Sequence, residues 1–294
     1  MHKFMRAIGF SEYMTHKEIN KLVSGIVMDS DSREYTTNDN DIIVGEFCKD
    51  FAPNIGIAVC GEFDEDDNFL FEYYFPYLRP TNITSNEELC VDRHGSKESY
   101  VGICDETRVG VSLIFYVQNM ISYIRAKHRR KNPLKNATLS MSALSLQGTI
   151  LMPIFKSKKV SANIERENFT RNILINAAKN GSSEAMEVLA LKDMDIYTSI
   201  SKKVLTQDIY SMVDTCFMPY GVECDNYAIL GEIKECELLT NELTGEEIYR
   251  MTISCNSMIF DLCINKKDLL GEPEVGRRFK GSIWMQGYIN YSNI

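Results

Sequence analysis

The first part of the chain predicts one helix followed by a series of strands. Residues 15–18 form a capping box, and hydrophobic residues follow at helical spacing, which predicts a helix from Thr15 to about Met28. The polar run Asp29–Asp41 is expected to end this helix. Hydrophobic alternation then predicts strands over residues 42–51, 55–63, 69–77, 88–92 and 99–104. The polar run Asp64–Asn68 is expected to be a solvated turn between two of them.

The middle of the chain contains the pattern that most favours a helix. Residues 110–130 place hydrophobic side chains on one stripe and basic residues in the last turns, with Pro133 just beyond. Residues 137–146 and 149–155 are then predicted to form a hairpin that turns at Gln147-Gly148. Together with the preceding strands, these elements predict an α+β domain.

A short helical part and a second set of strands follow. Residues 169–179 and 183–191 predict two helices joined by a turn at Asn180-Gly181, and a third helical segment is expected within residues 195–214. This unit occurs once, so a helical-repeat protein is excluded. Strands are predicted over residues 229–238, 247–255, 258–264 and 279–289, with a short helical turn within 265–271. These strands resemble a small barrel of the oligonucleotide- and oligosaccharide-binding (OB) type.

The predicted fold class is therefore α+β, with a mostly antiparallel N-terminal sheet and packed helices, a short helical segment, and a small C-terminal OB-like barrel. We expect three parts: an α+β domain over residues 1–160, a helical connection over 161–218, and a barrel-like domain over 219–294. The length of 294 residues agrees with about two domains.

Composition indicates a cytoplasmic protein. The first residues carry charge but no apolar run, so no signal peptide is expected, and no segment is apolar enough to span a membrane. The nine cysteines are an odd number without C-x-x-C spacing, which predicts reduced, mostly buried thiols rather than disulfides. Neither these cysteines nor the four histidines have the spacing of a zinc site, and Asp64–Asn68 lacks the glycine of a calcium loop. No metal or cofactor is expected.

Charge is distributed unevenly along the chain. The net charge is −9, yet residues 108–160 contain ten basic and no acidic residues. Most of this charge is one cluster, comprising Arg125, Lys127, Arg129, Arg130, Lys131 and Lys135. Such a cluster predicts a patch that binds an anion or a phosphate backbone. The alternative is a helix end whose basic residues complement the helix dipole beside an acidic N-terminal sheet.

A second cationic segment lies near the end of the chain. Arg277, Arg278, Lys280 and Trp284 combine positive and aromatic side chains on one predicted strand, as in proteins that bind single-stranded nucleic acid. Trp284 is equally consistent with an ordinary core position. The aromatic side chains at every second position of residues 69–77 also suit either stacking on a ligand or a hydrophobic core.

Candidate catalytic residues are few. The sequence contains no phosphate-binding loop, nucleophile elbow or kinase signature. On a strand, Asp92 and His94 would share one face, where the carboxylate could orient the imidazole, and Cys60 or Cys104 could be a nucleophile nearby. Each of these residues also suits a purely structural position.

A second candidate is a pair of carboxylates. If the predicted hairpin turns symmetrically about Asp67, Glu62 and Glu72 face each other across two strands. Opposed carboxylates raise one pKa and can perform acid–base chemistry, although a solvated position is the alternative.

Several segments of the sequence resemble those of an uncharacterised protein family of clostridial Firmicutes. They comprise residues 1–10, 56–63, 71–77, 217–225 and 271–287. The family is a domain of unknown function without known catalytic residues, so the resemblance implies no particular chemistry. It implies a cytoplasmic bacterial protein.

Two functions follow as hypotheses. The first is a non-catalytic binding or regulatory protein whose basic patch binds an anionic ligand or a protein partner. Nucleic acid is one such partner, although the net charge disfavours it, and no membrane partner is expected. The second is a hydrolase or transferase of unfamiliar type that uses His94 with Asp92.

Overall fold

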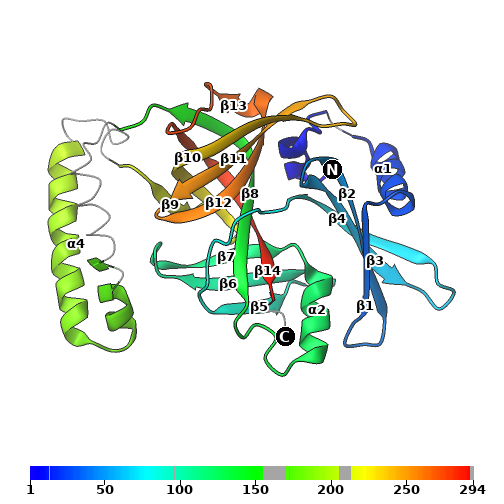
Figure 1. The fold of residues 1–294 in the computed structure, drawn as a ribbon, viewed down its shortest axis with the longest axis horizontal. Helices are drawn as coiled ribbons and strands as arrows, with labels where there is room; N and C mark the ends of the chain where they lie inside the picture. Colours follow the sequence, from blue (N-terminus) through cyan, green and yellow to red (C-terminus); the bar gives the residue numbers. More distant parts are fainter. Residues whose placement is uncertain (13, 96, 155–169, 172, 205–212, 292–294) are drawn as a thin grey trace.

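The computed structural model describes the chain except for residues 13, 96, 155–169, 172, 205–212 and 292–294. Strands dominate it and form two sheets (Figure 1). None of the nine cysteines forms a disulfide, and five of them are buried, as expected for reduced thiols.

The first sheet is an antiparallel meander in the order β1-β2-β3-β4. Its strands are β1 (Ser32–Thr37), β2 (Ile43–Ala52), β3 (Ile55–Phe63) and β4 (Phe69–Leu78). Helix α1 (His16–Met28) precedes it, and the capping box is present, because Thr15 and Glu18 bind each other's backbone amides. The predicted helix, three strands and solvated turn are therefore confirmed. Strand β1 lies in the polar run and was not expected.

The second sheet closes into a five-stranded barrel. Its strands are β8 (Thr138–Leu151), β10 (Asn226–Thr240), β11 (Glu247–Cys255), β12 (Met258–Asn265) and β14 (Arg278–Asn290). Strands β10, β11 and β12 form a meander, β8 pairs with β12 in parallel, and β14 closes the ring by pairing with both β8 and β10. Short elements border it: β9 (Cys216–Pro219), η2 (Lys266–Asp268) and β13 (Leu269–Leu270).

This barrel is compatible with the OB-like expectation, but one of its strands comes from the first half of the chain. A boundary at residue 160 separates β8 from the four barrel strands that follow, whereas the structure joins all five by strand pairing. One hydrophobic cluster also contains residues of both sheets.

The predicted helix over residues 110–130 is wrong in its first half. Residues Val111–Val117 form strand β7, and only Met120–Arg129 form a helix, α2. Leu113, Phe115 and Val117 alternate with more exposed residues, so they bury one face of a strand. Strand β7 pairs in parallel with β14 and continues the barrel sheet through β6 (Tyr100–Glu106) and β5 (Leu89–Arg93).

The predicted hairpin at Gln147-Gly148 is also wrong, because β8 passes through both residues without turning. Gly148 is needed here for close packing rather than for a turn. A Cβ at this position would lie 2.3 Å from Cε2 of the buried Phe279 on β14. The glycine therefore lets the Phe279 ring cross the strand.

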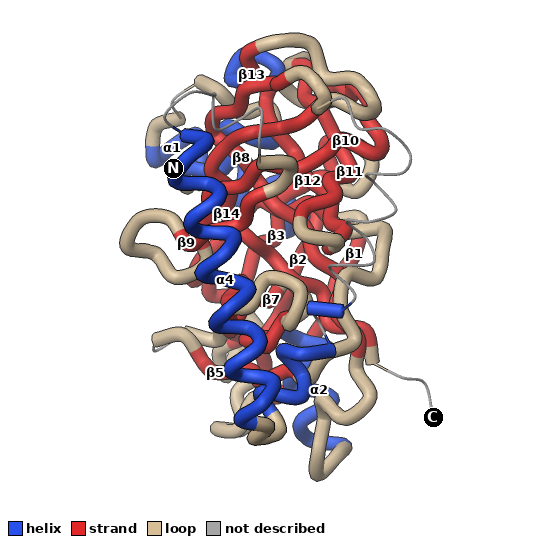
Figure 2. The backbone as a smooth tube through the Cα atoms, turned by 90° about the vertical axis from the view of Figure 1, so that its left-hand side faces the viewer, coloured by secondary structure: helices blue, strands red, loops and turns tan. Residues whose placement is uncertain are grey.

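The helical segment is present in the part that the structure describes. Residues 173–179 are helical, Gly181 adopts the left-handed conformation, and α4 (Ser183–Val204) follows. Helix α4 continues through the start of the third predicted segment, whose remainder falls partly outside the described residues. Figures 1 and 2 show α4 along one side of the molecule, away from the four-stranded sheet. The helices packed in the N-terminal half are few: α1, α2 and the short η1 (Lys3–Ile8).

Candidate functional site

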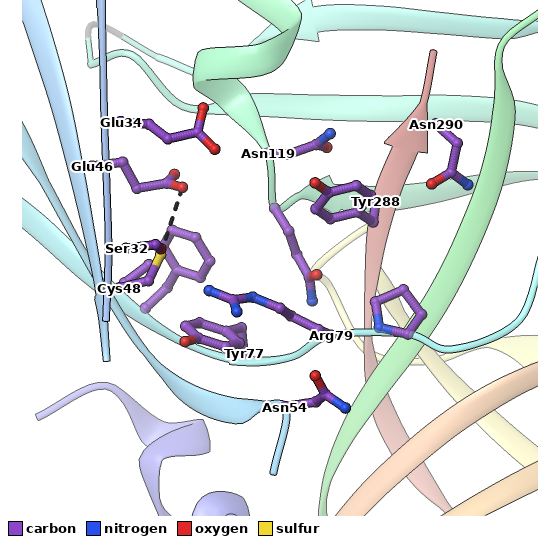
Figure 3. A pocket seen from close by; sticks show the side chains of 14 residues that line it. Ser32, Glu34, Glu46, Cys48, Asn54, Tyr77, Arg79, Asn119, Tyr288 and Asn290 are labelled. Carbon is purple, nitrogen blue, oxygen red and sulfur yellow. Dashed lines mark hydrogen bonds between the residues drawn. The ribbon is translucent and has the colours of Figure 1, made fainter. Parts of the chain in front are cut away.

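A pocket of about 410 Å³ lies between the four-stranded sheet and the end of the barrel sheet. Its volume falls within the usual range of small-molecule sites. Side chains from β1, β2, β3, β4, the β7–α2 connection and β14 line it (Figure 3). The polar lining residues are Ser32, Glu34, Glu46, Cys48, Asn54, Tyr77, Arg79, Gln118, Asn119, Tyr288 and Asn290.

Two carboxyl groups enter the pocket from neighbouring strands. Glu34 on β1 and Glu46 on β2 are direct cross-strand partners, and both side chains extend into the same space (Figure 3). Glu34 accepts a hydrogen bond of 2.7 Å from Arg125 on α2. Glu46 is only 8% exposed, and burial, together with the nearby Glu34, raises its pKa to about 8. Burial and the neighbouring carboxyl group therefore favour the protonated form of Glu46 at neutral pH.

The immediate partners of Glu46 are thiols. Cys48 and Cys60 donate long hydrogen bonds to its two carboxyl oxygens, at 3.7 Å and 3.9 Å. Burial raises the pKa of both thiols, and the Glu46 charge adds to this effect. Both cysteines are thus protonated at neutral pH, which argues against Cys60 as a nucleophile.

Arg79 supplies positive charge to the same pocket. Its side chain is 35% exposed, and its guanidinium stacks on the ring of Tyr77 at 4.8 Å. The carboxylate of Asp50 is 3.8 Å away, too far for a hydrogen bond, and accepts one from the Tyr77 hydroxyl instead. Among the described residues, no oxygen accepts a hydrogen bond from this guanidinium. The Cys48 sulfur is a further, weak partner of the guanidinium. Arg79 therefore keeps N–H donors in the pocket that have no oxygen acceptor.

Gln118 carries the other unsatisfied polar group in the pocket wall. Its amide nitrogen donates to the Leu78 carbonyl and to Gln286, at 2.9 Å and 2.7 Å, and these acceptors fix the orientation of the amide. The residue is 6% exposed, and its Oε1 has no hydrogen-bond partner in the described part of the chain. An orphaned buried acceptor of this kind is costly and often marks a functional site.

Glu62 and Glu72, the carboxylate pair expected from the sequence, are not directly opposed. Glu62 pairs with Leu70, and a bulge after Cys60 shifts the register so that Glu72 falls opposite the irregularity. Both are half-buried, and burial and then the Glu62 charge raise the pKa of Glu72. The symmetric hairpin assumed from the sequence is thus wrong, and neither residue lines the pocket.

His94 and Asp92 are both exposed, at and just beyond the end of β5. No hydrogen bond or ion pair joins their side chains in the described structure, and neither lines the pocket. Cys104 is fully buried beside Ser85, and burial raises its pKa to about 11. The structure therefore does not bring the expected histidine, carboxylate and thiol together, and their catalytic role stays a prediction.

The basic cluster lies at and beyond the end of α2. Arg125 binds Glu34, and Lys127 and His128 bind Asp39, so part of the cluster complements acidic residues of the N-terminal sheet. Arg129, Lys131 and Lys135 are exposed, whereas Arg130 is half-buried. Binding of nucleic acid or another anion by these residues stays a prediction.

The second cationic segment contains anchored side chains. Arg278 is buried and donates to the carbonyls of Met152 and Val213. Trp284 is 6% exposed, stacks on Phe4 at 5.1 Å, and donates its indole N–H to Asp225. Arg277 pairs with Glu274, and Lys280 is exposed. Trp284 thus occupies a core position rather than an open stacking surface.

The described residues contain no group of three or more histidine, cysteine, aspartate or glutamate side chains that could hold a metal ion. Nor does this part of the chain include a helix of sufficient length and hydrophobicity to cross a membrane.

Comparison with protein families agrees with the expected resemblance. The model of DUF3881, described as a domain of unknown function from an E. rectale gene, matches residues 5–287. The chain belongs to this family. No curated protein and no solved structure matches it significantly.

Sequence reasoning missed most of the residues that form the pocket. Glu34, Glu46, Arg79 and Gln118 belong to no motif. The β1–β2 register brings the two glutamates together, and packing against the β7–α2 connection adds Gln118. One signal was available for Glu46, a charged residue within the hydrophobic run of residues 42–51. Such residues are almost never fully buried unless they are paired.

Proposed function

We propose that this protein is a binding protein, and that the pocket between its two sheets holds a small molecule with a carboxylate or phosphate group. Arg79 is the residue that binds this group. The planar guanidinium matches carboxylate and phosphate oxygens in a bidentate manner, and Tyr77 supports its position by stacking.

The unused donors of Arg79 carry this proposal. A guanidinium that ends in a pocket normally bonds to carboxylate or carbonyl oxygens of the protein, whereas here Asp50 lies 3.8 Å away. An anionic ligand would supply the missing acceptors. We infer that the protein binds this ligand in the cytoplasm, because the nine unpaired cysteines support a reducing compartment.

Mass spectrometry under native and denaturing conditions, combined with thermal unfolding in the presence of small carboxylates and phosphates, tests this function. We expect the wild-type protein to retain a small molecule or to gain thermal stability from one of these anions. The variant Arg79→Met keeps the aliphatic stem but removes the donors, so it should lose both effects.

Arg277→Met is the matched control, because Arg277 is a half-buried arginine outside the pocket wall that pairs with Glu274. It should behave as the wild-type protein does. Equal anion effects in the wild-type protein and in Arg79→Met would contradict the proposal, as would the absence of any effect in the wild-type protein.

A further inference from the structure

We propose that the ligand of this pocket is a zwitterion, with a carboxylate that binds Arg79 and an ammonium group that binds between Glu34 and Glu46. This inference rests on the proposed function and specifies its ligand class. Figure 3 shows the geometry: the two glutamates reach into the pocket from β1 and β2, and Arg79 lies across from them beside Tyr77.

The Glu46 carboxylate lacks strong hydrogen-bond donors among the described residues. It has only the thiol donors at 3.7 Å and 3.9 Å. An ammonium group has three N–H donors and a positive charge, so it can satisfy Glu46 and Glu34 together.

Two further polar groups of the pocket lack partners of the right kind. The unused donors of Arg79 require an acceptor, and the orphaned Oε1 of Gln118 in the pocket wall requires a donor. A zwitterion supplies the acceptor through its carboxylate and the donor through its ammonium group. Phe75, Ala58 and Pro80 contribute apolar surface to the same pocket, which suits a short hydrocarbon chain between the two ends.

The charges around Glu46 explain why its own proton must leave when such a ligand binds. The titratable groups that face it are Glu34, Cys48, Cys60, Arg79, Tyr73, Tyr116 and Tyr288. Arg79 is the only cation among them, and its attraction is outweighed by burial and by Glu34, so the pKa is about 8. A bound ammonium reverses this balance, lowers the pKa and releases a proton.

Isothermal titration calorimetry with two matched series of probes tests the inference. The first series runs from glycine to 5-aminovalerate, and the second contains the corresponding acids without the amine, acetate to valerate. We expect one amino acid to bind at least about tenfold more tightly than its matched acid, the effect of a charge-assisted hydrogen bond. Titrations in buffers of different ionisation enthalpy should show release of about one proton per ligand near pH 7.

Two variants separate the roles of the carboxyl groups. Glu46→Gln resembles the neutral acid in shape, so it should fold, bind the amino acid no more tightly than the matched acid, and release no proton. Glu34→Gln should weaken the preference for the amino acid but keep the proton release.

The outcomes distinguish the two proposals. If the wild-type protein binds the acids as tightly as the amino acids, without proton release, the zwitterion is wrong while anion binding by Arg79 stands. If Arg79→Met binds both series as the wild-type protein does, or if the wild-type protein binds neither series, the proposed function fails as well.

Discussion

Glu34 and Glu46 are direct neighbours across β1 and β2, yet their surroundings differ, and burial raises the pKa of Glu46 to about 8. Arg125 binds Glu34, whereas Glu46 is buried against two thiols. The sequence predicts an opposed pair of carboxylates elsewhere, at Glu62 and Glu72. The opposed carboxylates of this sheet lie instead on β1 and β2, at the edge opposite to β3 and β4.

The raised pKa of Glu46 predicts a pH-dependent stability. Its pKa is about 8 in the folded protein and 4.5 as a reference value, so between these pH values the folded state binds more protons than the unfolded state. Stability contributed by this group is therefore complete below about pH 4.5 and is lost as the pH rises to 8, by up to about 1.4 kcal/mol per pH unit. Glu46→Gln should remove this loss and be more stable than the wild-type protein near pH 8, by a few kcal/mol.

Urea unfolding at several pH values between 5 and 8 measures this difference. Glu62→Gln is the matched control, because it makes the same charge change on β3 at a half-buried position outside the pocket. An identical pH dependence in the wild-type protein and Glu46→Gln would show that Glu46 titrates normally.

The sequence predicts correctly those helices and strands whose formation depends on neighbouring residues in the chain. The capping box at Thr15 specifies the start of α1, and alternation specifies β2, β3 and β4. The stripe that includes Leu113 and Val117 fits both helical and strand periodicity, and only its pairing with β14, far along the chain, decides for a strand. Strand β1 carries mostly polar residues, so its pairing with β2 has no hydrophobic signal.

The pocket was less predictable because its residues depend on register and on packing between sheets. Glu34 faces Glu46 only through the β1–β2 register, and the bulge beside Cys60 moves Glu72 out of line with Glu62. Bulges are set by side-chain packing on both strands rather than by a local motif. Arg79 and Gln118 meet in the pocket because the β4 end and the β7–α2 connection pack together.

The packing of Phe279 over Gly148 predicts that Gly148→Ala destabilises the protein. The new methyl group would lie 2.3 Å from the ring, so β8 or β14 must shift, at a cost of about 1–3 kcal/mol. Chemical unfolding measures the change. Gly25→Ala is the control, since Gly25 lies within α1 and a Cβ there meets nothing within 4 Å. It should stabilise by about 0.5–1 kcal/mol through helix propensity. Equal effects in both variants would refute the packing argument.

The hydrogen bond between Trp284 and Asp225 predicts a second destabilising substitution. Trp284→Phe keeps an aromatic ring against Phe4 but removes the N–H donor, which leaves the Asp225 carboxyl without this partner. Burial already raises the pKa of Asp225, and the indole donor lowers it, so the variant should raise it further. We expect a loss of about 1–3 kcal/mol in unfolding free energy.

Circular dichroism must follow this unfolding, because Trp284 is the only tryptophan and the variant has no indole fluorescence. Asp225→Asn provides the comparison, since its amide oxygen can still accept from Trp284 and the loss should be smaller. A larger loss in Asp225→Asn than in Trp284→Phe would assign the main contribution of Asp225 to its charge instead.

The different burial of the nine cysteines predicts a graded reaction with thiol reagents. Cys90 and Cys224 are exposed and should react first in the native protein, and the half-buried Cys216 and Cys236 should follow. The five buried thiols should react only on unfolding, because burial excludes the reagent and raises their pKa values. Mass spectrometry after timed alkylation, with peptide mapping, measures this order. Rapid alkylation of Cys60 in the native protein would contradict the enclosed environment of Glu46, and with it the raised pKa on which the pH dependence relies.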